Sequence, residues 1–248
     1  MFNFLDEKHK IVSMLSAQTT NTFIELVNKT KEQGATGFCL LFGPMKPEEK
    51  SIENFKKIIA AGDNRAYVTN YRRDNSEKHL TDDDLARQLL EIADEVPCLM
   101  DVMTDYYAPA PDEVTRDAAA VRRQKELISE IHARGSQVLM SAHIFEYRSP
   151  ENILEIALRQ QERGADIAKI VTTVNGEKEE IDSIRTILLL REQLNIPFVY
   201  FCNGANTKPV RRMGGILGSC FYLCQENSFT AGPQPTIAQA KAMIELMK

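Results

Sequence analysis

The chain alternates between short runs of apolar residues and longer segments in which apolar residues recur every three or four positions. The short runs are apolar at almost every residue rather than at every second one, which is typical of parallel strands buried on both faces. We therefore predict eight buried strands. They cover residues 11–15, 37–42, 66–70, 98–103, 137–141, 166–172, 197–202 and 218–223.

The longer segments have the period of amphipathic helices, and their ends carry helix signals. Gly34 and Gly62 each follow such a segment, as C-terminal glycines do, and Ser149 before Pro150 is typical of a helix start. The predicted helices cover residues 20–33, 52–61, 82–93, 112–133, 150–163, 178–194, 209–214 and 236–247. Eight strand–helix units in 248 residues predict a single-domain (β/α)8 TIM barrel over residues 1–248. A doubly wound open sheet is the alternative.

Charge and composition exclude several classes of partner. Thirty basic residues against 35 acidic ones give a net charge of -5, which argues against binding to nucleic acid or to an anionic membrane. No segment approaches the roughly 18 apolar residues of a membrane helix, and the first ten residues lack a signal-peptide pattern. The five cysteines are scattered and no metal-binding spacing occurs, so we expect reduced thiols, no metal and a cytoplasmic protein. Neither a G-x-G-x-x-G motif nor a P-loop supports a nucleotide cofactor.

One lysine lies inside a predicted strand. Lys169 is flanked by apolar residues, and burial disfavours the charged form of an amine. In a barrel, functional residues lie at the carboxyl ends of the strands, where an amine with a lowered pKa can attack a ketone and form a Schiff base. The alternative is a lysine that extends to the rim or pairs with a neighbouring strand.

Other polar residues follow the predicted strands. His143 alone among the four histidines follows a buried strand, next to the strand of Lys169, and the pair suits removal of a proton α to an imine; a core histidine is the alternative. Arg73 and Glu77 are interpreted as a carboxylate clamp and an acid that orients the histidine, or else as an exposed charged loop. Residues 211–212 form a second candidate anion clamp, with a solvated basic turn as the alternative.

Four segments together resemble a known family. They read Ser-Ala-His-Ile-Phe (141–145), Gly-Ala-Asp-Ile-Ala-Lys-Ile (164–170), Arg-Met-Gly-Gly-Ile-Leu-Gly-Ser (212–219) and Thr-Ala-Gly-Pro-Gln-Pro-Thr (230–236). In this order they resemble type I 3-dehydroquinate dehydratase, over essentially the whole chain. The resemblance implies a homodimeric barrel that dehydrates 3-dehydroquinate to 3-dehydroshikimate in the shikimate pathway, without metal or other cofactor.

The resemblance also implies roles for individual residues. Lys169 forms the imine, His143 acts as general acid and base, and Glu77 orients the histidine. A lid over residues 227–234 is expected to close over the substrate. The matched substrate-binding residues are Arg73, Arg212, Thr230 and Gln234.

The chain departs from the family in the second strand. Cys39 and Leu41 stand where the family has an acid and an arginine that hold substrate hydroxyls, and Asp101-Val102-Met103 keeps one of two acids in the fourth strand. We therefore expect weak activity on 3-dehydroquinate, or a divergent Schiff-base lyase for a less hydroxylated cyclic keto-acid. A non-catalytic barrel that binds a carboxylated ligand and an unrelated barrel enzyme such as a class I aldolase are further alternatives, although the intact Lys169 and His143 argue against a non-catalytic role.

Overall fold

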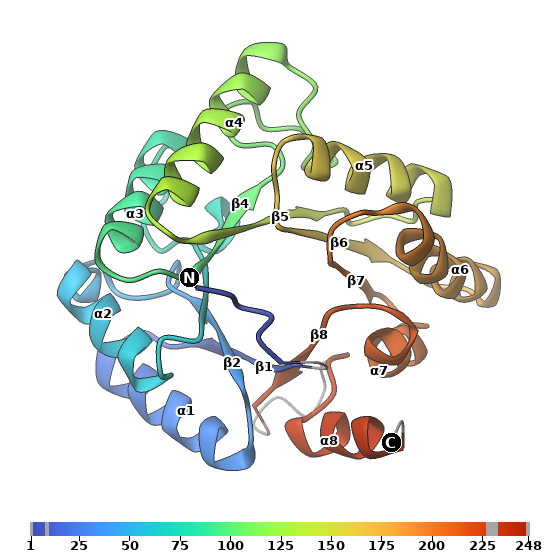
Figure 1. Ribbon diagram of the computed structural model, residues 1–248, viewed down its shortest axis with the longest axis horizontal. Coiled ribbons are helices and arrows are strands. Elements are labelled where there is room, and N and C mark those ends of the chain that lie inside the picture. Colours follow the sequence, from blue (N-terminus) through green and yellow to red (C-terminus); the bar gives the residue numbers. More distant parts are fainter. Residues whose placement is uncertain (1, 8–9, 227–232, 247–248) are drawn as a thin grey trace.

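The strands form one parallel sheet that curls around a central axis, and the helices cover its outside (Figure 1). The computed structural model describes residues 2–7, 10–226 and 233–246. The strands in this part of the chain are β1 (Lys10–Ser16), β2 (Gly37–Leu41), β3 (Ala66–Thr69), β4 (Leu99–Met103), β5 (Gln137–His143), β6 (Ile167–Thr173), β7 (Phe198–Asn203) and β8 (Phe221–Gln225).

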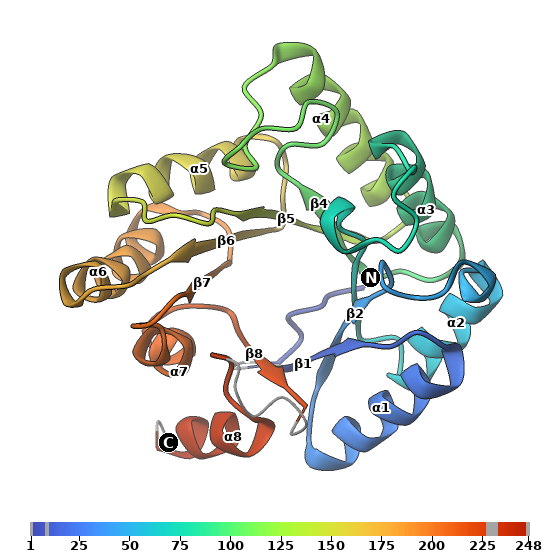
Figure 2. The ribbon, with the colours of Figure 1, turned by 180° about the vertical axis from the view of Figure 1, so that it is seen from behind.

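Each strand is followed by a helix that runs back along the outside of the sheet (Figures 1 and 2). Thr20–Gln33 and Ile52–Ala61 have the predicted bounds. Two short 3-10 helices, η1 (Pro47–Glu49) and η2 (Arg72–Asp74), lie in the loops after β2 and β3. The α-helices of the described chain are α1 (Thr20–Gln33), α2 (Ile52–Ala61), α3 (Asp82–Glu95), α4 (Ala118–Ala133), α5 (Pro150–Glu162), α6 (Glu177–Gln193), α7 (Lys208–Leu217) and α8 (Ile237–Glu245).

The sheet closes on itself. Neighbouring strands follow the order β7-β6-β5-β4-β3-β2-β1-β8, and β1 pairs with both β2 and β8. On the remaining side, the Cys220 amide just before β8 donates to the Phe198 carbonyl of β7 at 2.9 Å. The predicted (β/α)8 barrel is confirmed, and the open doubly wound sheet is wrong.

Alternate residues of the strands fill the barrel or pack against the helices, as the period of a strand requires. In β6, Ile167 and Val171 belong to the interior cluster, whereas Ala168 and Ile170 pack in the layer beneath the helices. Lys169 lies between Ile167 and Val171 and therefore points inward. Phe4, from the segment before β1, belongs to the interior cluster too and packs edge-on against Tyr67 and Phe221.

One helix begins later than predicted. The helix expected from residue 112 starts at Ala118, where the Asp117 side chain caps it by accepting from the Ala120 amide. Residues 104–117 instead form a loop at the carboxyl end of β4. Within it, Glu113 has a φ of 50°, a left-handed backbone conformation that a right-handed helix does not contain. Among the described helices, none combines the length and the hydropathy that a membrane span needs.

Candidate active site

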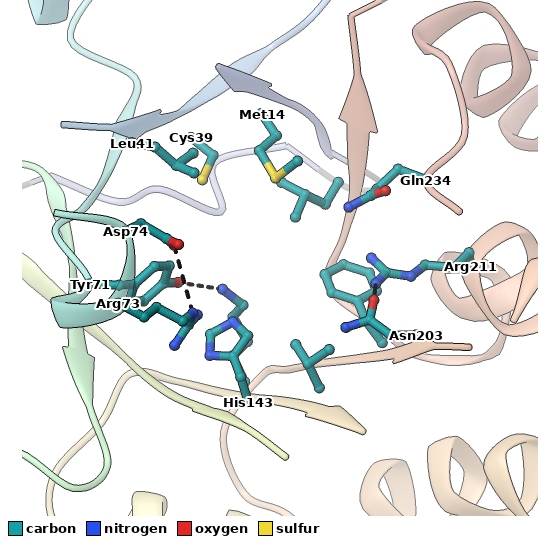
Figure 3. A pocket seen from close by; sticks show the side chains of 14 residues that line it. Met14, Cys39, Leu41, Tyr71, Arg73, Asp74, His143, Asn203, Arg211 and Gln234 are labelled. Atoms are coloured by element: carbon teal, nitrogen blue, oxygen red, sulfur yellow. Dashed lines mark hydrogen bonds and ion pairs between the residues drawn. The ribbon is translucent and has the colours of Figure 1, made fainter. Parts of the chain in front are cut away.

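A cavity opens at the carboxyl ends of the strands, where the functional sites of (β/α)8 barrels lie (Figure 3). Its two sides differ in polarity. In Figure 3, Met14, Cys39 and Leu41 lie on one side, and Arg73 and His143 lie on the other. The complete lining is Met14, Cys39, Leu41, Tyr71, Arg73, Asp74, His143, Lys169, Val171, Phe201, Asn203, Arg211, Leu223 and Gln234.

Lys169 is the buried amine of this cavity, with 4% of its surface exposed. Its Nζ lies 2.7 Å from the Tyr71 hydroxyl, 2.9 Å from the Tyr67 hydroxyl and 3.6 Å from Oδ2 of Asp101. Asp101 is itself buried and accepts hydrogen bonds from both tyrosines and from Ser141. A carboxylate therefore balances the lysine charge, and the two phenols bridge them.

Burial sets the protonation of this group. Removal from water lowers the pKa of Lys169, while Asp101 opposes that effect. The pKa values of Tyr71 and Tyr67 lie well above 10, because burial and the nearby Asp101 both disfavour a phenolate. The tyrosines are therefore neutral donors, and Lys169 releases its proton more readily than a lysine in water.

His143 ends β5 and is held by a carboxylate from the loop 104–117. Oε2 of Glu113 accepts from the His143 backbone amide at 2.8 Å and lies 3.2 Å from Nδ1 of the ring. Oε1 of the same carboxylate pairs with Nη1 of Arg73 at 2.6 Å. Glu113 adopts a left-handed backbone with φ of 50°, a conformation that costs a non-glycine residue about 1–2 kcal/mol.

The surroundings of His143 favour its neutral form. Burial comes first among the causes that lower its pKa well below 6.5, and the cations Lys169 and Arg73 add to it. The contact with Glu113 assigns the ring proton to Nδ1, because a carboxylate accepts and does not donate. The other nitrogen, Nε2, then carries the lone pair that a general base needs.

Glu77 does not occupy the position expected for the acid that orients His143. It forms an ion pair with the buried Lys50 at 3.1 Å and does not line the cavity. The chain turns through η2 immediately before it, so Glu77 is directed toward the loop after β2 instead. Glu113 provides the carboxylate at the histidine, and sequence reasoning missed it because residues 112–117 were predicted to be helical.

Arg211 and Arg212 are consecutive residues of α7, and their side chains point in different directions. Arg211 is buried, lines the cavity, and donates to the Cys202 carbonyl and to Oδ1 of Asn203, both at 2.8 Å. Arg212 is exposed and does not line the cavity, because adjacent helical residues point about 100° apart. Of the two arginines expected to form an anion clamp, Arg211 therefore faces the cavity and Arg212 does not.

The last two expected residues belong to the segment after β8. Gln234 lines the cavity and accepts a hydrogen bond from the Gln225 side chain at 2.5 Å. Thr230 and most of the expected lid lie outside the described residues. Within the described ranges, no group of three or more His, Cys, Asp or Glu side chains is placed to hold a metal ion.

The fold and the cavity together define a (β/α)8-barrel protein with a buried amine, a neutral imidazole and two cationic side chains around one pocket. This combination suits chemistry on a carbonyl compound that carries an anionic group. The family model for type I 3-dehydroquinase matches residues 50–248, and the chain belongs to this family.

Individual relatives are distant. Over 125 residues the chain is 27% identical to 3-dehydroquinate dehydratase of Alkaliphilus oremlandii (50% of this chain, 49% of that protein). It is 30% identical over 125 residues to the enzyme of Pyrococcus abyssi, covering 50% of this chain and 55% of that one. These alignments span about half the length of the curated relatives.

Solved structures agree over nearly the whole fold. The 3-dehydroquinate dehydratase of Geobacillus kaustophilus superposes with a TM-score of 0.81 at 14% identity, covering 98% of this chain and 91% of that one. The type I enzyme of Clostridium difficile, solved with covalently modified comenic acid, gives a TM-score of 0.80 at 18% identity, with 98% and 93% covered. At these identities the likeness concerns the fold alone.

Proposed function

We propose that the protein is a Schiff-base-forming dehydratase that converts 3-dehydroquinate to 3-dehydroshikimate. The observation that carries this proposal is the buried Lys169 amine in the wall of a cavity that also holds His143. Membership of the type I 3-dehydroquinase family supports the same reaction. The proposed substrate combines a ketone, a β-hydroxyl group and a carboxylate, and the cavity has a candidate partner for each.

The lysine acts first. Its nitrogen attacks the ketone carbon, water leaves, and the resulting iminium withdraws electrons from the neighbouring carbon. Because the lowered pKa of Lys169 makes the free amine more available, this step needs less free energy than it would for a lysine in water.

The histidine then moves the proton. Nε2 of His143 takes the α-proton of the iminium, the electron pair forms an enamine, and the enamine expels the β-hydroxyl group. The imidazolium returns the same proton to the leaving oxygen, so water departs and His143 is neutral again. Glu113 stabilises the transient imidazolium through Nδ1. Hydrolysis of the remaining iminium frees Lys169 and the product.

Two arginines of the cavity can bind the carboxylate of an anionic substrate. Arg73 and Arg211 both line the cavity, and Figure 3 shows them on opposite sides of His143. Arg211 is proposed to bind the carboxylate in place of Arg212, and Gln234 to bind a polar group of the ring. Thr230 keeps its proposed role as a substrate contact from the lid.

Borohydride reduction tests the proposal. Incubation with 3-dehydroquinate or 3-dehydroshikimate followed by borohydride should add the mass of one reduced ligand, located at Lys169 by peptide mapping. Lys169→Met should lose the adduct, while Lys50→Met, which removes a lysine with a buried side chain that does not line the cavity, should retain it. An adduct that persists in Lys169→Met would reject Lys169 as the nucleophile.

A second candidate function follows from the opposite wall of the cavity. Met14, Cys39, Leu41 and Leu223 offer no charged partner to a ring hydroxyl, and an unpaired hydroxyl against such a surface is costly. We infer that a less hydroxylated cyclic keto-acid with the same ketone and leaving group is the alternative substrate. Comparison of kcat/KM for 3-dehydroquinate with that for an analogue lacking one ring hydroxyl decides between them; a higher value for 3-dehydroquinate rejects this candidate. The homodimer and the cytoplasmic location stay predictions.

A further inference from the structure

We infer that Tyr71 is a further catalytic residue, which relays protons between Lys169 and Asp101 while the imine forms and is hydrolysed. This inference rests on the proposed Schiff-base function and concerns a different step from the one assigned to His143. Tyr71 follows β3, lines the cavity, and is 6% exposed. Its hydroxyl touches the reacting nitrogen, at 2.7 Å from Nζ of Lys169.

The directions of the hydrogen bonds define a path. Asp101 accepts from the Tyr71 hydroxyl, so the lone pairs of the Tyr71 oxygen are available to accept from the lysine ammonium. The order is therefore ammonium, phenol, carboxylate. A proton can pass from Lys169 to Tyr71 while the phenolic proton passes to Asp101. The free amine and the neutral acid then form without a phenolate, which the raised pKa of Tyr71 disfavours.

The same path supplies and removes the protons that imine formation requires. After the amine attacks, the nitrogen gives a proton to Tyr71 and the phenolic proton moves to the former carbonyl oxygen, which yields a neutral carbinolamine. The carbon–oxygen bond then breaks as Tyr71 protonates the leaving hydroxyl and recovers the proton held by Asp101. Water departs, the nitrogen lone pair completes the iminium, and the Asp101 carboxylate faces the new positive charge.

Tyr67 provides a matched comparison. Its hydroxyl also contacts Nζ, at 2.9 Å, and donates to Asp101, but Tyr67 is fully buried and does not line the cavity. It can support the charge of the lysine, yet it lies away from the space that the substrate oxygen enters. Tyr71 also packs edge-on against His143, with ring centroids 5.0 Å apart, which places it between the two proposed catalytic groups.

The test measures the rate of adduct formation. The protein is mixed with 3-dehydroshikimate, samples are reduced with borohydride at increasing times, and the adduct is quantified by intact mass. Tyr71→Phe should slow adduct formation by about 10²–10⁴, the usual range for general acid–base catalysis, and Tyr67→Phe by less than tenfold. In a Lys169→Met background, adding Tyr71→Phe should leave the non-covalent affinity for 3-dehydroshikimate within about threefold, because the phenol transfers protons and does not carry the binding.

Two outcomes overturn the relay: an unchanged rate in Tyr71→Phe, or an equal loss in Tyr67→Phe. Absence of any adduct in the unmodified protein overturns the Schiff-base function as well, which separates the two failures. The unmodified protein gives an independent measurement in mixtures of H2O and D2O. If more than one proton moves in the same step, the rate of adduct formation should depend on the deuterium fraction along a curve. A rate that does not change with the deuterium fraction would refute the relay.

Discussion

The carboxylate of Glu113 offers a sharp test of the site, because the structure and the sequence motif assign its role to different residues. We predict that Glu113→Gln lowers turnover while leaving imine formation intact. Both oxygens of Glu113 face donors: Oε1 faces Arg73, and Oε2 faces the backbone amide and Nδ1 of His143. A glutamine keeps the shape but has one oxygen, so one side of this arrangement must lose its acceptor and meet an NH2 group instead.

The expected fall in kcat can be worked out from the hydrogen bond that is lost. A hydrogen bond to a charged group contributes about 1.5–3 kcal/mol, and each 1.36 kcal/mol changes a rate by about tenfold. If the full loss reaches the proton-transfer step, kcat should fall by about 10- to 150-fold. The borohydride adduct at Lys169 should still form, because the hydrogen bonds of Glu113 go to Arg73 and His143 rather than to the amine network around Lys169.

Glu77→Gln is the matched control. It removes the same charge from the residue that the motif favours, but Glu77 pairs with Lys50 outside the cavity. We expect its kcat to stay within about twofold of the unmodified value. The free energy of unfolding should fall by about 1–3 kcal/mol, because the buried Lys50 loses an anionic partner.

Steady-state kinetics, borohydride trapping and urea denaturation of the two variants decide the matter. If Glu77→Gln loses turnover and Glu113→Gln does not, the histidine is oriented by Glu77 during catalysis and our interpretation of the contact is refuted. Equal losses in both variants would show that the loop after β3 and the loop 104–117 act as one unit.

Further predictions concern three other residues that line the cavity, His143, Arg211 and Leu41. His143→Ala should still form the borohydride adduct, but its kcat should fall by about 10²–10⁴. Folding lowers the pKa of His143, so as the pH falls the histidine takes up a proton in the unfolded chain before it does so in the folded one. The free energy of unfolding should therefore fall as pH drops below about 6.5 and level off below the folded pKa, and His143→Gln should reduce this slope; an identical slope would refute the burial argument. Arg211→Lys should weaken binding of carboxylated ligands by about 10- to 100-fold while Arg212→Ala leaves it within twofold, as measured by calorimetry, and the reverse order would return the clamp to Arg212. Leu41→Arg should raise kcat/KM for 3-dehydroquinate, and a decrease would show that the apolar wall is not the cause of weak recognition.

The barrel itself was predictable from the sequence because its strands are buried on both faces. A short run that is apolar at nearly every position fits few structures besides a buried strand, and eight such runs alternating with amphipathic segments allow few topologies. Lys169 and His143 were predictable for the same reason. A polar residue in or just after a buried parallel strand points into the barrel or ends at its carboxyl rim, so its position along the strand nearly determines its place in the site.

For residues on loops, the position in the sequence does not determine the place in the site. The acidic residues that follow Pro111 in the loop 104–117 resemble the first turn of a helix, so the longer helix was predicted. Its path, with Tyr107 and Glu113 in left-handed backbone conformations, depends on contacts that no local pattern contains. Tyr71 was missed for another reason: a tyrosine beside a buried strand is usually a core residue, and its role depends on the hydroxyl contacts.

Where Glu113 lies indicates which parts of such a site are constrained by chemistry and which are not. A neutral imidazole that must become an imidazolium needs an anion at Nδ1, and burial near Lys169 and Arg73 makes this need stronger. The carboxylate can come from any part of the chain, provided that it reaches His143 at the end of β5. The loop after β4 begins beside that point because β4 pairs with β5, and the loop after β3 begins one strand further along the sheet. A carboxylate from either loop satisfies the same electrostatic requirement, so a family motif that places the acid after β3 does not exclude a relative in which the loop after β4 provides it.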